Sequence, residues 1–136
     1  MIREARHEDI PAIRRLMEAE PGFWQQAWSN ETLARGIDSA GGMAFIWEDS
    51  NEIIGFVCAH DVGFRAYLSE LIVAQQMRGR GVGKGLLERV QTNLAQRGCA
   101  TLIADVWHEA VPFYRALGWE PPRAVLLRWK NSSKTE

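Results

Sequence analysis

Hydrophobic and polar positions along the chain change their spacing several times, and each change predicts a new element. Apolar residues three or four positions apart predict amphipathic helices over about 8–20, 30–37, 82–97 and 109–117. Short runs rich in β-branched and aromatic residues predict strands over 2–5, 43–47, 52–59, 66–73, 100–107 and 124–129. A polar turn joins the second and third strands as an antiparallel hairpin, whereas a helix separates the fourth from the fifth, which favours a parallel pair. The order of elements predicts a mixed α+β domain.

The length of 136 residues suits a single domain, which we expect to span 1–130, followed by a polar tail over 131–136 that is predicted to be disordered. Hydrophobic residues make up 46% of the chain and charged residues 24%, as in ordinary globular proteins. No apolar run is long enough to cross a bilayer, and the N-terminus lacks the apolar segment of a secretory signal. We therefore expect a cytoplasmic protein without membrane contact.

The formal net charge is -1, which argues against a general attraction to nucleic acid or anionic membranes. Cys58 and Cys99 stand in apolar, strand-like runs and show no metal-binding or redox spacing. They are most simply reduced, buried residues, with a catalytic cysteine as the alternative. The sequence therefore predicts no metal site and no nucleic-acid partner.

The strand 66–73 leads into a loop in which glycines alternate with basic residues, and a helix follows. The residues of this basic glycine loop are Arg78, Gly79, Arg80, Gly81, Val82, Gly83 and Lys84. Glycines leave backbone N–H groups uncovered, and the start of a helix carries partial positive charge, so both favour a bound phosphate. The alternative is a tight surface turn with solvated basic side chains.

Two common phosphate-binding loops do not fit this pattern. A Walker A loop requires a glycine where Arg78 stands and a serine or threonine where Gly85 stands. A dinucleotide-binding fingerprint that starts at Gly79 or Gly81 requires glycine in place of Lys84 or Leu86. The loop must therefore belong to another class.

The loop resembles the acyl-CoA pyrophosphate loop of the GNAT family of N-acetyltransferases, which reads Gln or Arg, two residues, Gly, one residue, then Gly or Ala. Residues 78–83 match this pattern in full. A second stretch, 110–119, resembles the family block of alanine, Phe-Tyr and Leu-Gly-aromatic. The resemblance extends over about 1–129. It implies a twisted, mostly antiparallel sheet flanked by helices, with splayed, parallel fourth and fifth strands, and acetyl-CoA as co-substrate.

The resemblance also assigns the donor site. It implies that Leu71, Ile72 and Val73 contact the donor thioester, and that backbone N–H groups near Ile72 and Val73 polarise its carbonyl group. The loop residues 78–84 would hold the pyrophosphate. Many family members carry an asparagine seven residues before the tyrosine of the second block, but this chain has Trp107 there. That asparagine commonly helps to hold the pantetheine arm, so this contact is expected to be absent or replaced.

Acyl transfer from a thioester to an amine requires a base for the amine and a proton donor for the thiolate. Tyr114 matches the family tyrosine that acts as general acid, and its alternative role is that of a core aromatic residue. Glu70 is the candidate base, because its apolar neighbours favour a raised pKa, and its alternative role is to pair with an arginine. His60, His108 and water are the other candidate bases.

The first function that these residues favour is transfer of an acetyl group from acetyl-CoA to a primary amine of a small molecule, peptide or protein. The second is a non-catalytic acyl-CoA sensor or interaction module, which Trp107 mildly favours. The sequence does not identify the acceptor, although a pocket walled by Trp24, Trp28 and Trp107 would suit an apolar or aromatic amine. Relatives commonly form dimers, so a homodimer is compatible with the resemblance without being fixed by it.

Overall fold

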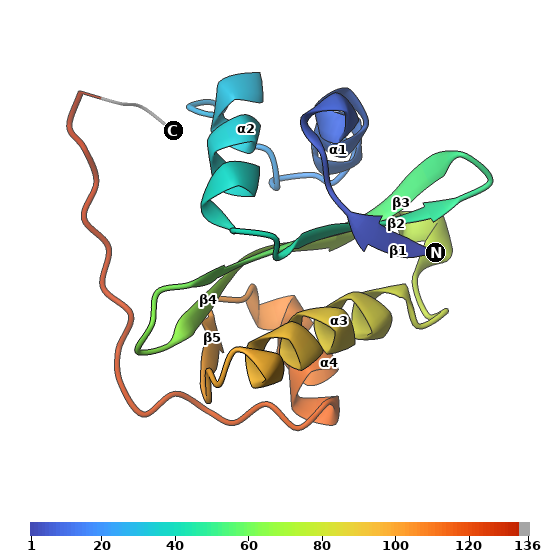
Figure 1. Ribbon diagram of the computed structural model, residues 1–136. Helices are drawn as coiled ribbons and strands as arrows, with labels where there is room; N and C mark the ends of the chain where they lie inside the picture. Colours follow the sequence, from blue (N-terminus) through green and yellow to red (C-terminus); the bar gives the residue numbers. More distant parts are fainter. Residues whose placement is uncertain (134–136) are drawn as a thin grey trace.

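The computed structural model describes residues 1–133 and contains a five-stranded sheet between two layers of helices (Figure 1). The strands follow one another in the sheet as they do in the chain: β1 (Ile2–Glu4), β2 (Ala44–Asp49), β3 (Glu52–Asp61), β4 (Ala66–Val73) and β5 (Leu102–Ala104). The first four strands pair antiparallel, and β5 pairs with β4 in parallel. The predicted α+β class with a parallel fourth and fifth strand is confirmed.

Helices α1 (Ile10–Glu18) and α2 (Asn30–Ser39) cover one face of the sheet, and α3 (Val82–Gln96) and α4 (Val111–Ala116) lie on the other (Figure 1). Three short 3-10 turns complete the described elements: η1 (His7–Asp9), η2 (Gln75–Met77) and η3 (His108–Ala110). Two hydrophobic clusters fill the space on the two faces of the sheet. Each helix thus buries its apolar stripe against the strands, as the three- and four-residue spacing of its apolar residues predicts.

Local sequence signals set the ends of these elements. Ser29 caps α2, because the N–H group of Thr32 donates to Ser29 Oγ at 3.3 Å and the N–H group of Ser29 donates to Thr32 Oγ1 at 3.0 Å. Ser50 and Asn51 have φ values of 51° and 65° and form the tight turn between β2 and β3. Positive φ at both central residues is the geometry of the hairpin turn that matches the twist of the strands.

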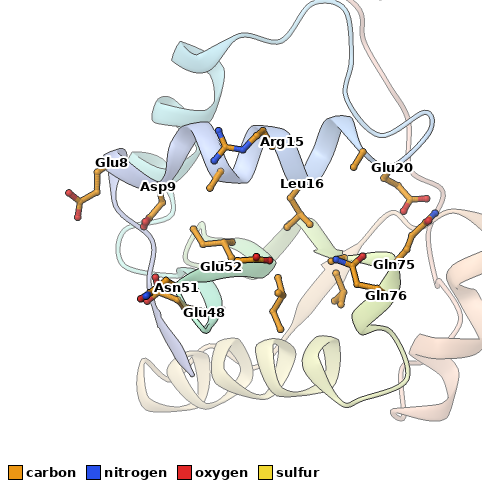
Figure 2. A pocket seen from close by; sticks show the side chains of 16 residues that line it. Glu8, Asp9, Arg15, Leu16, Glu20, Glu48, Asn51, Glu52, Gln75 and Gln76 are labelled. Atoms are coloured by element: carbon orange, nitrogen blue, oxygen red, sulfur yellow. The ribbon is translucent and has the colours of Figure 1, made fainter.

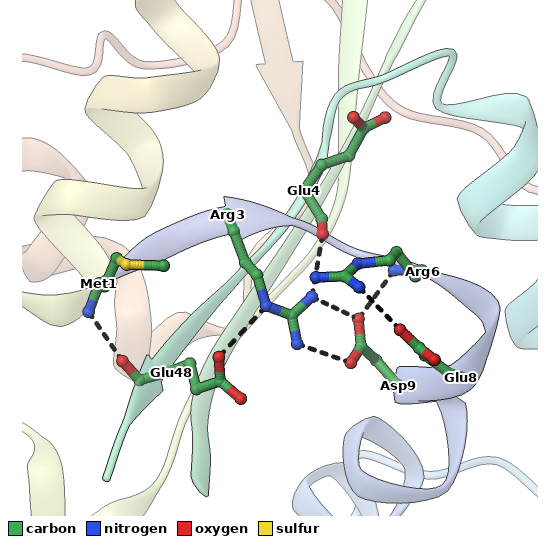
Figure 3. Close-up of polar contacts among 7 residues, drawn as sticks. All are labelled: Met1, Arg3, Glu4, Arg6, Glu8, Asp9 and Glu48. Carbon is green, nitrogen blue, oxygen red and sulfur yellow. Dashed lines mark hydrogen bonds and ion pairs between the residues drawn. The ribbon is translucent and has the colours of Figure 1, made fainter. Parts of the chain in front are cut away.

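Arg3 on β1 fixes the first strand to the start of the first helix (Figure 3). Its Nη1 and Nη2 atoms donate to the two carboxylate oxygens of Asp9 at 2.9 and 2.8 Å, and its Nε donates to Glu48 at 3.3 Å. The hydrogen bond from Arg3 lowers the pKa of Asp9, so this buried carboxyl group is ionised and paired near neutral pH. The bidentate pair holds η1 and α1 in place over the sheet.

Two predicted strands differ from the structure. β5 has only three residues instead of the predicted 100–107, and the segment 124–129 forms no strand. Its side chains are exposed, with Val125 at 83% and Leu127 at 87%. β-branched and apolar residues favour a strand only when a neighbouring strand can accept the hydrogen bonds, and the pairing of β5 stops at Ala104. The prediction of a last strand over 124–129 was therefore wrong.

Other sequence features are placed as follows. Cys58 is buried in β3, as predicted, whereas Cys99 is half-buried in the connection between α3 and β5. Both cysteines are free thiols. Within residues 1–133, no helix combines the length and the apolar character needed to cross a membrane. The predicted tail over 131–136 is described as far as Ser133, and 134–136 lie outside the described residues.

Candidate active site

The parallel pairing of β4 with β5 is short. Ala66, Tyr67 and Leu68 pair with 102–104, and the ladder then ends. In the described chain, the edge of β4 from Ser69 to Val73 that faces away from β3 has no partner strand. The residues predicted to hold the thioester, Leu71, Ile72 and Val73, lie along this unpaired edge. The strands therefore leave an opening where unpaired backbone groups can bind a ligand.

A β-bulge in β4 sets the direction of the side chains beside this opening. Cys58 pairs with Glu70 while the next residue, Ala59, pairs with Leu68, so Ser69 has no partner in the β3–β4 ladder. As a result, the consecutive residues Ser69 and Glu70 line the same cavity on the α1–α2 face of the sheet. Bulges commonly redirect a side chain next to an active site.

The Glu70 carboxyl group is the acid within this cavity. Burial raises its pKa from an ordinary 4.5 to about 7, and the negative charge of Asp105 adds to the effect. Asp105, which follows β5, accepts a hydrogen bond of 2.5 Å from the hydroxyl group of Tyr67. Burial, followed by this contact with Asp105, raises the pKa of Tyr67. Glu70 can therefore change its protonation state near neutral pH while the Tyr67 phenol stays protonated.

Sequence reasoning missed Tyr67 and Asp105. The available signal for Asp105 was its charge, because it is the one acidic residue in the apolar run that predicted a strand over 100–107. The contact of Tyr67 with it depends on the parallel register, which the sequence did not reveal.

His60 belongs to the same cavity as Glu70, whereas His108 lies exposed in η3. The Nδ1 atom of His60 forms a 3.0 Å hydrogen bond with Ser39 Oγ, and its Nε2 forms a 2.8 Å hydrogen bond with Ser69 Oγ. Both ring nitrogens are therefore occupied by hydroxyl groups. His60 is therefore part of a polar network beside Glu70. His108 lies outside this cavity, unlike Glu70 and His60.

The alternative of a catalytic cysteine is disfavoured by the surroundings of Cys58. Burial raises the pKa of its thiol to about 12, so almost none of it is the reactive thiolate near neutral pH.

Among residues 1–133, no three His, Cys, Asp or Glu side chains come together in a group that could hold a metal ion.

The basic glycine loop connects η2 to α3. Gly79 and Gly81 have φ values of 78° and 83°, in the left-handed region that side-chain-bearing residues rarely adopt. Gly81 stands at the N-cap of α3 without a side-chain cap, and the first turn of the helix contains no acidic residue. The free N–H groups and the helix dipole therefore favour an anion at this end. Arg80 and Lys84 are exposed beside it, and neither takes part in an ion pair of the described chain.

Arg78 differs from the other two cations of the loop. Its Nη2 is paired with the carboxylate of Glu20, and its Nε donates to the carbonyl oxygen of Val73 at 3.2 Å. Figure 2 shows Glu20 near the end of α1, beside a groove of about 620 Å³ that also contacts Gln75 and Gln76. Of the predicted site residues, only Val73 lines this groove. Arg78 therefore connects the loop to the turn that follows α1.

Tyr114 lies on α4 and is 9% exposed. Its ring packs edge-on against Phe113 and Trp119, with centroids 5.2 and 5.1 Å away. Burial raises the pKa of its phenol to about 12. The hydroxyl group makes no hydrogen bond with residues 1–133. The packing thus matches a core aromatic residue whose hydroxyl group has no partner among the described residues.

The aromatic residues of the α1–α2 connection form a continuous row. Trp24 packs against Trp28 with centroids 5.5 Å apart, and Phe23 contacts both Trp28 at 6.4 Å and Trp107 at 5.8 Å. Trp107 is half exposed and lies just beyond β5. The three tryptophans are thus linked through Phe23, although of these only Trp28 lines the cavity that contains Glu70.

Comparison with known proteins adds to this geometry. Residues 10–119 match the model of the acetyltransferase (GNAT) family. Peptidyl-lysine N-acetyltransferase YiaC of Escherichia coli is 28% identical over 98% of this chain and 90% of its own length. The PaiA N-acetyltransferase of Thermoplasma acidophilum, solved in complex with coenzyme A, has a TM-score of 0.80 and 16% identity, covering 92% of each chain.

A third similar protein is the ribosomal-protein-S18-alanine N-acetyltransferase of Escherichia coli. It has a TM-score of 0.72 and 26% identity, covering 87% of this chain and 76% of its own. The family match covers most of the chain. The chain also has a sheet whose parallel β4–β5 pair is short and then separates. The chain therefore belongs to the GNAT family and is a GNAT-type N-acetyltransferase.

Proposed function

We propose that this protein transfers the acetyl group of acetyl-CoA directly to a primary amine of a small molecule or peptide within a ternary complex. One observation carries the proposal. The unpaired edge of β4 runs from Glu70 to Val73, with an ionisable carboxyl group at one end and the route to the basic glycine loop at the other. A base and an anion-binding helix end are thus joined by one opening.

The donor half of the proposal rests on α3 and β4. The N-terminus of α3 with Arg80 and Lys84 would hold the pyrophosphate, while Leu71, Ile72 and Val73 would flank the pantetheine and thioester. Backbone N–H groups on an unpaired edge can donate to the thioester oxygen as negative charge develops there. The relative from Thermoplasma acidophilum was solved with coenzyme A, which supports this choice of donor.

In the proposed reaction, the amine nitrogen forms a bond to the thioester carbonyl carbon and the carbon–sulfur bond breaks. The proton of the amine passes to Glu70, whose pKa of about 7 suits a base near neutral pH. The sulfur receives a hydrogen bond, and then the proton, from the hydroxyl group of Tyr114, and the phenol regains a proton from solvent while Glu70 releases its own. A phenol with a pKa of about 12 is a weak acid, so its main contribution is a hydrogen bond to the developing thiolate.

The acceptor is proposed as a primary amine without assigning it to one molecule. YiaC is named for peptidyl lysine and another similar protein for an alanine of a ribosomal protein, so relatives of this chain act on peptide amines of two kinds. Glu70 and the nearby Asp105 give the site negative charge, which attracts a cationic amine before it loses its proton.

Calorimetric titration with acetyl-CoA tests the donor half, with dephospho-CoA and free phosphate as controls. We expect saturable binding of acetyl-CoA with an affinity on the order of micromolar. A panel of amines, assayed by release of CoA, then tests the transfer. Binding without release of CoA by any amine would contradict the reaction and leave a non-catalytic acyl-CoA-binding module.

A further inference from the structure

A cavity of about 240 Å³ lies between α1 and α2 above strands β3 and β4. Its apolar wall is made of Met17, Trp28, Leu33, Ile37 and Phe56. Four of these five residues are buried, with Trp28 as the exception, so the apolar end belongs to the hydrophobic core. Glu70, Ser69 and His60 form the polar end.

Gly36 lies beside this cavity in the interior of α2. It does not have the left-handed φ that would demand glycine, and a Cβ atom placed on it meets no heavy atom within 4 Å. Neither backbone conformation nor packing therefore explains glycine at this position, although glycine is less favourable than alanine inside a helix. A residue that is unfavourable for its helix and brings no structural benefit is expected mainly at functional sites. The benefit of glycine at position 36 is functional, because it leaves open space next to the cavity.

The size of the cavity limits its occupant. An apolar cavity of about 150 Å³ holds a benzene molecule, and sites for whole drug-sized ligands begin at about 300 Å³. The volume of about 240 Å³ thus suits one compact group of a larger molecule.

The charge of the cavity limits the occupant further. Glu70 is the one acidic residue on its wall, and the wall contains no lysine or arginine. An amine is favoured at the polar end, while a second charged group in the apolar end would lose its hydration without a partner. A lysine side chain that reached Glu70 from solvent would leave the apolar end unfilled.

We propose that this cavity is a subsite for a compact, uncharged apolar group that the acceptor carries next to its amine. The amine lies at Glu70, and the apolar group fills the apolar end along the face of α2 that contains Leu33, Gly36 and Ile37. Amines with a leucine-like substituent on the adjacent carbon are therefore better acceptors than an unsubstituted amine or a lysine side-chain amine. This proposal rests on the proposed acetyl transfer.

The test compares leucinamide, glycinamide and Nα-acetyl-lysinamide as acceptors for the protein with saturating acetyl-CoA. Leucinamide and glycinamide present the same α-amine and differ in the apolar group. We expect kcat/KM for leucinamide to exceed that for glycinamide by about tenfold or more, because the side chain leaves water. Equal values, or a preference for Nα-acetyl-lysinamide, would overturn the proposal.

The variant Gly36→Leu places a side chain where a Cβ has open space, and it should bring the ratio of leucinamide to glycinamide close to one. Its titration with acetyl-CoA, which does not involve the cavity, reports whether the variant is folded. Arg35→Leu is the matched control, because Arg35 is exposed on the same helix and does not line the cavity. The proposal would be overturned if Gly36→Leu kept the parent's ratio of kcat/KM for leucinamide to that for glycinamide. It would also be overturned if Arg35→Leu lowered this ratio as much as Gly36→Leu.

Failure of the proposed function is distinguishable from failure of the subsite. If acetyl-CoA binds and glycinamide is acetylated as well as leucinamide, the transfer reaction stands and the subsite is rejected. If no amine releases CoA, the transfer reaction fails, and direct titration of leucinamide decides the subsite. Saturable binding of leucinamide, which glycinamide does not show and Gly36→Leu removes, would support the subsite. Absence of leucinamide binding would reject it.

Discussion

Phe23 packs edge-on against Trp107, with ring centroids 5.8 Å apart and ring planes at 67°. Phe23 belongs to the connection between α1 and α2, and Trp107 lies just beyond β5. Three residues before Phe23, Glu20 is paired with Arg78 of the loop that follows β4. The segment from Glu20 to Phe23 thus contacts the chain beyond both strands of the opened pair. It forms a bridge across the mouth of the opening.

Replacing either aromatic residue of this bridge by leucine should weaken acetyl-CoA binding or acceptor use with little loss of stability, since Trp107 is half exposed. Edge-to-face pairs are worth about 0.5–1.5 kcal/mol. A double-mutant cycle with Phe23→Leu and Trp107→Leu, measured as kcat/KM, should give a coupling energy in this range. Additive effects of the two substitutions would show that the contact does not support the site. Trp129→Leu, an exposed tryptophan away from the bridge, is the control.

The three cations of the basic glycine loop should contribute unequally to donor binding. Arg80 and Lys84 are exposed beside the N-terminus of α3, whereas Arg78 is already paired with Glu20. Arg80→Gln and Lys84→Gln should each weaken acetyl-CoA binding by about 1 kcal/mol, or about fivefold, and reduce its dependence on salt. Arg78→Gln should have a smaller effect. Calorimetry at two salt concentrations measures this, with Arg35→Gln as a remote control. An Arg78→Gln loss as large as the others would indicate that its pair with Glu20 opens when acetyl-CoA binds.

Glu70 should lower the stability of the fold as the pH rises through neutrality. Its pKa is about 7 in the folded protein, above the ordinary value of 4.5, so the folded state binds the proton more tightly than the unfolded state. The stability that this carboxyl group contributes is present below about pH 4.5 and is lost as the pH rises through about 7. Glu70→Gln should therefore be more stable than the parent at about pH 8, by on the order of 1–2 kcal/mol, and lose this advantage at about pH 4.5.

Urea unfolding of the parent and of Glu70→Gln at the two pH values measures this difference, since other titrating groups cancel in the comparison. The same variant should be slower in acetyl transfer at about pH 8, because glutamine cannot accept the proton of the amine. A pH–rate profile that overlays that of the parent would remove Glu70 from the role of base, whatever its effect on stability.

Tyr114→Phe should separate turnover from donor binding. The ring would keep its contacts with Phe113 and Trp119, so folding and acetyl-CoA affinity should be close to those of the parent. Loss of a hydrogen bond to the departing thiolate should lower kcat by about 10- to 100-fold. Because the pKa of Tyr114 is about 12, the parent should show no loss of rate from phenol ionisation below about pH 10. An unchanged kcat would leave Tyr114 with a packing role alone.

The main features of the fold and the glycine turn after β4 could be predicted from the sequence because they depend on local signals. The spacing of apolar residues gave the helices, and the glycines gave the turn between β4 and α3. The bulge that brings Ser69 and Glu70 into one cavity was not predictable, because it depends on the register between β3 and β4. Register is set by packing across the whole sheet and leaves no local mark.

The segment 124–129 illustrates the opposite case, in which a clear local signal misleads. Its apolar residues have strand propensity, yet the segment joins no strand of the described sheet and its side chains are exposed. In the bridge, Glu20 contacts Arg78 and Phe23 contacts Trp107, and each pair is separated by more than fifty positions in the sequence. Contacts of this kind follow from the assembled fold.

Gly36→Ala tests the claim that Gly36 is present for space instead of for backbone conformation. The residue has an ordinary helical backbone, and an added methyl group meets no atom within 4 Å. Alanine should therefore stabilise α2 and raise the free energy of unfolding by about 0.5–1 kcal/mol. Urea unfolding near pH 7 measures this change, and Gly98→Ala is the contrasting control, because Gly98 has a φ of 76° and should be destabilised by the same methyl group. A loss of stability in Gly36→Ala would mean that the glycine serves the fold, and it would remove the argument that its open space is kept for an acceptor.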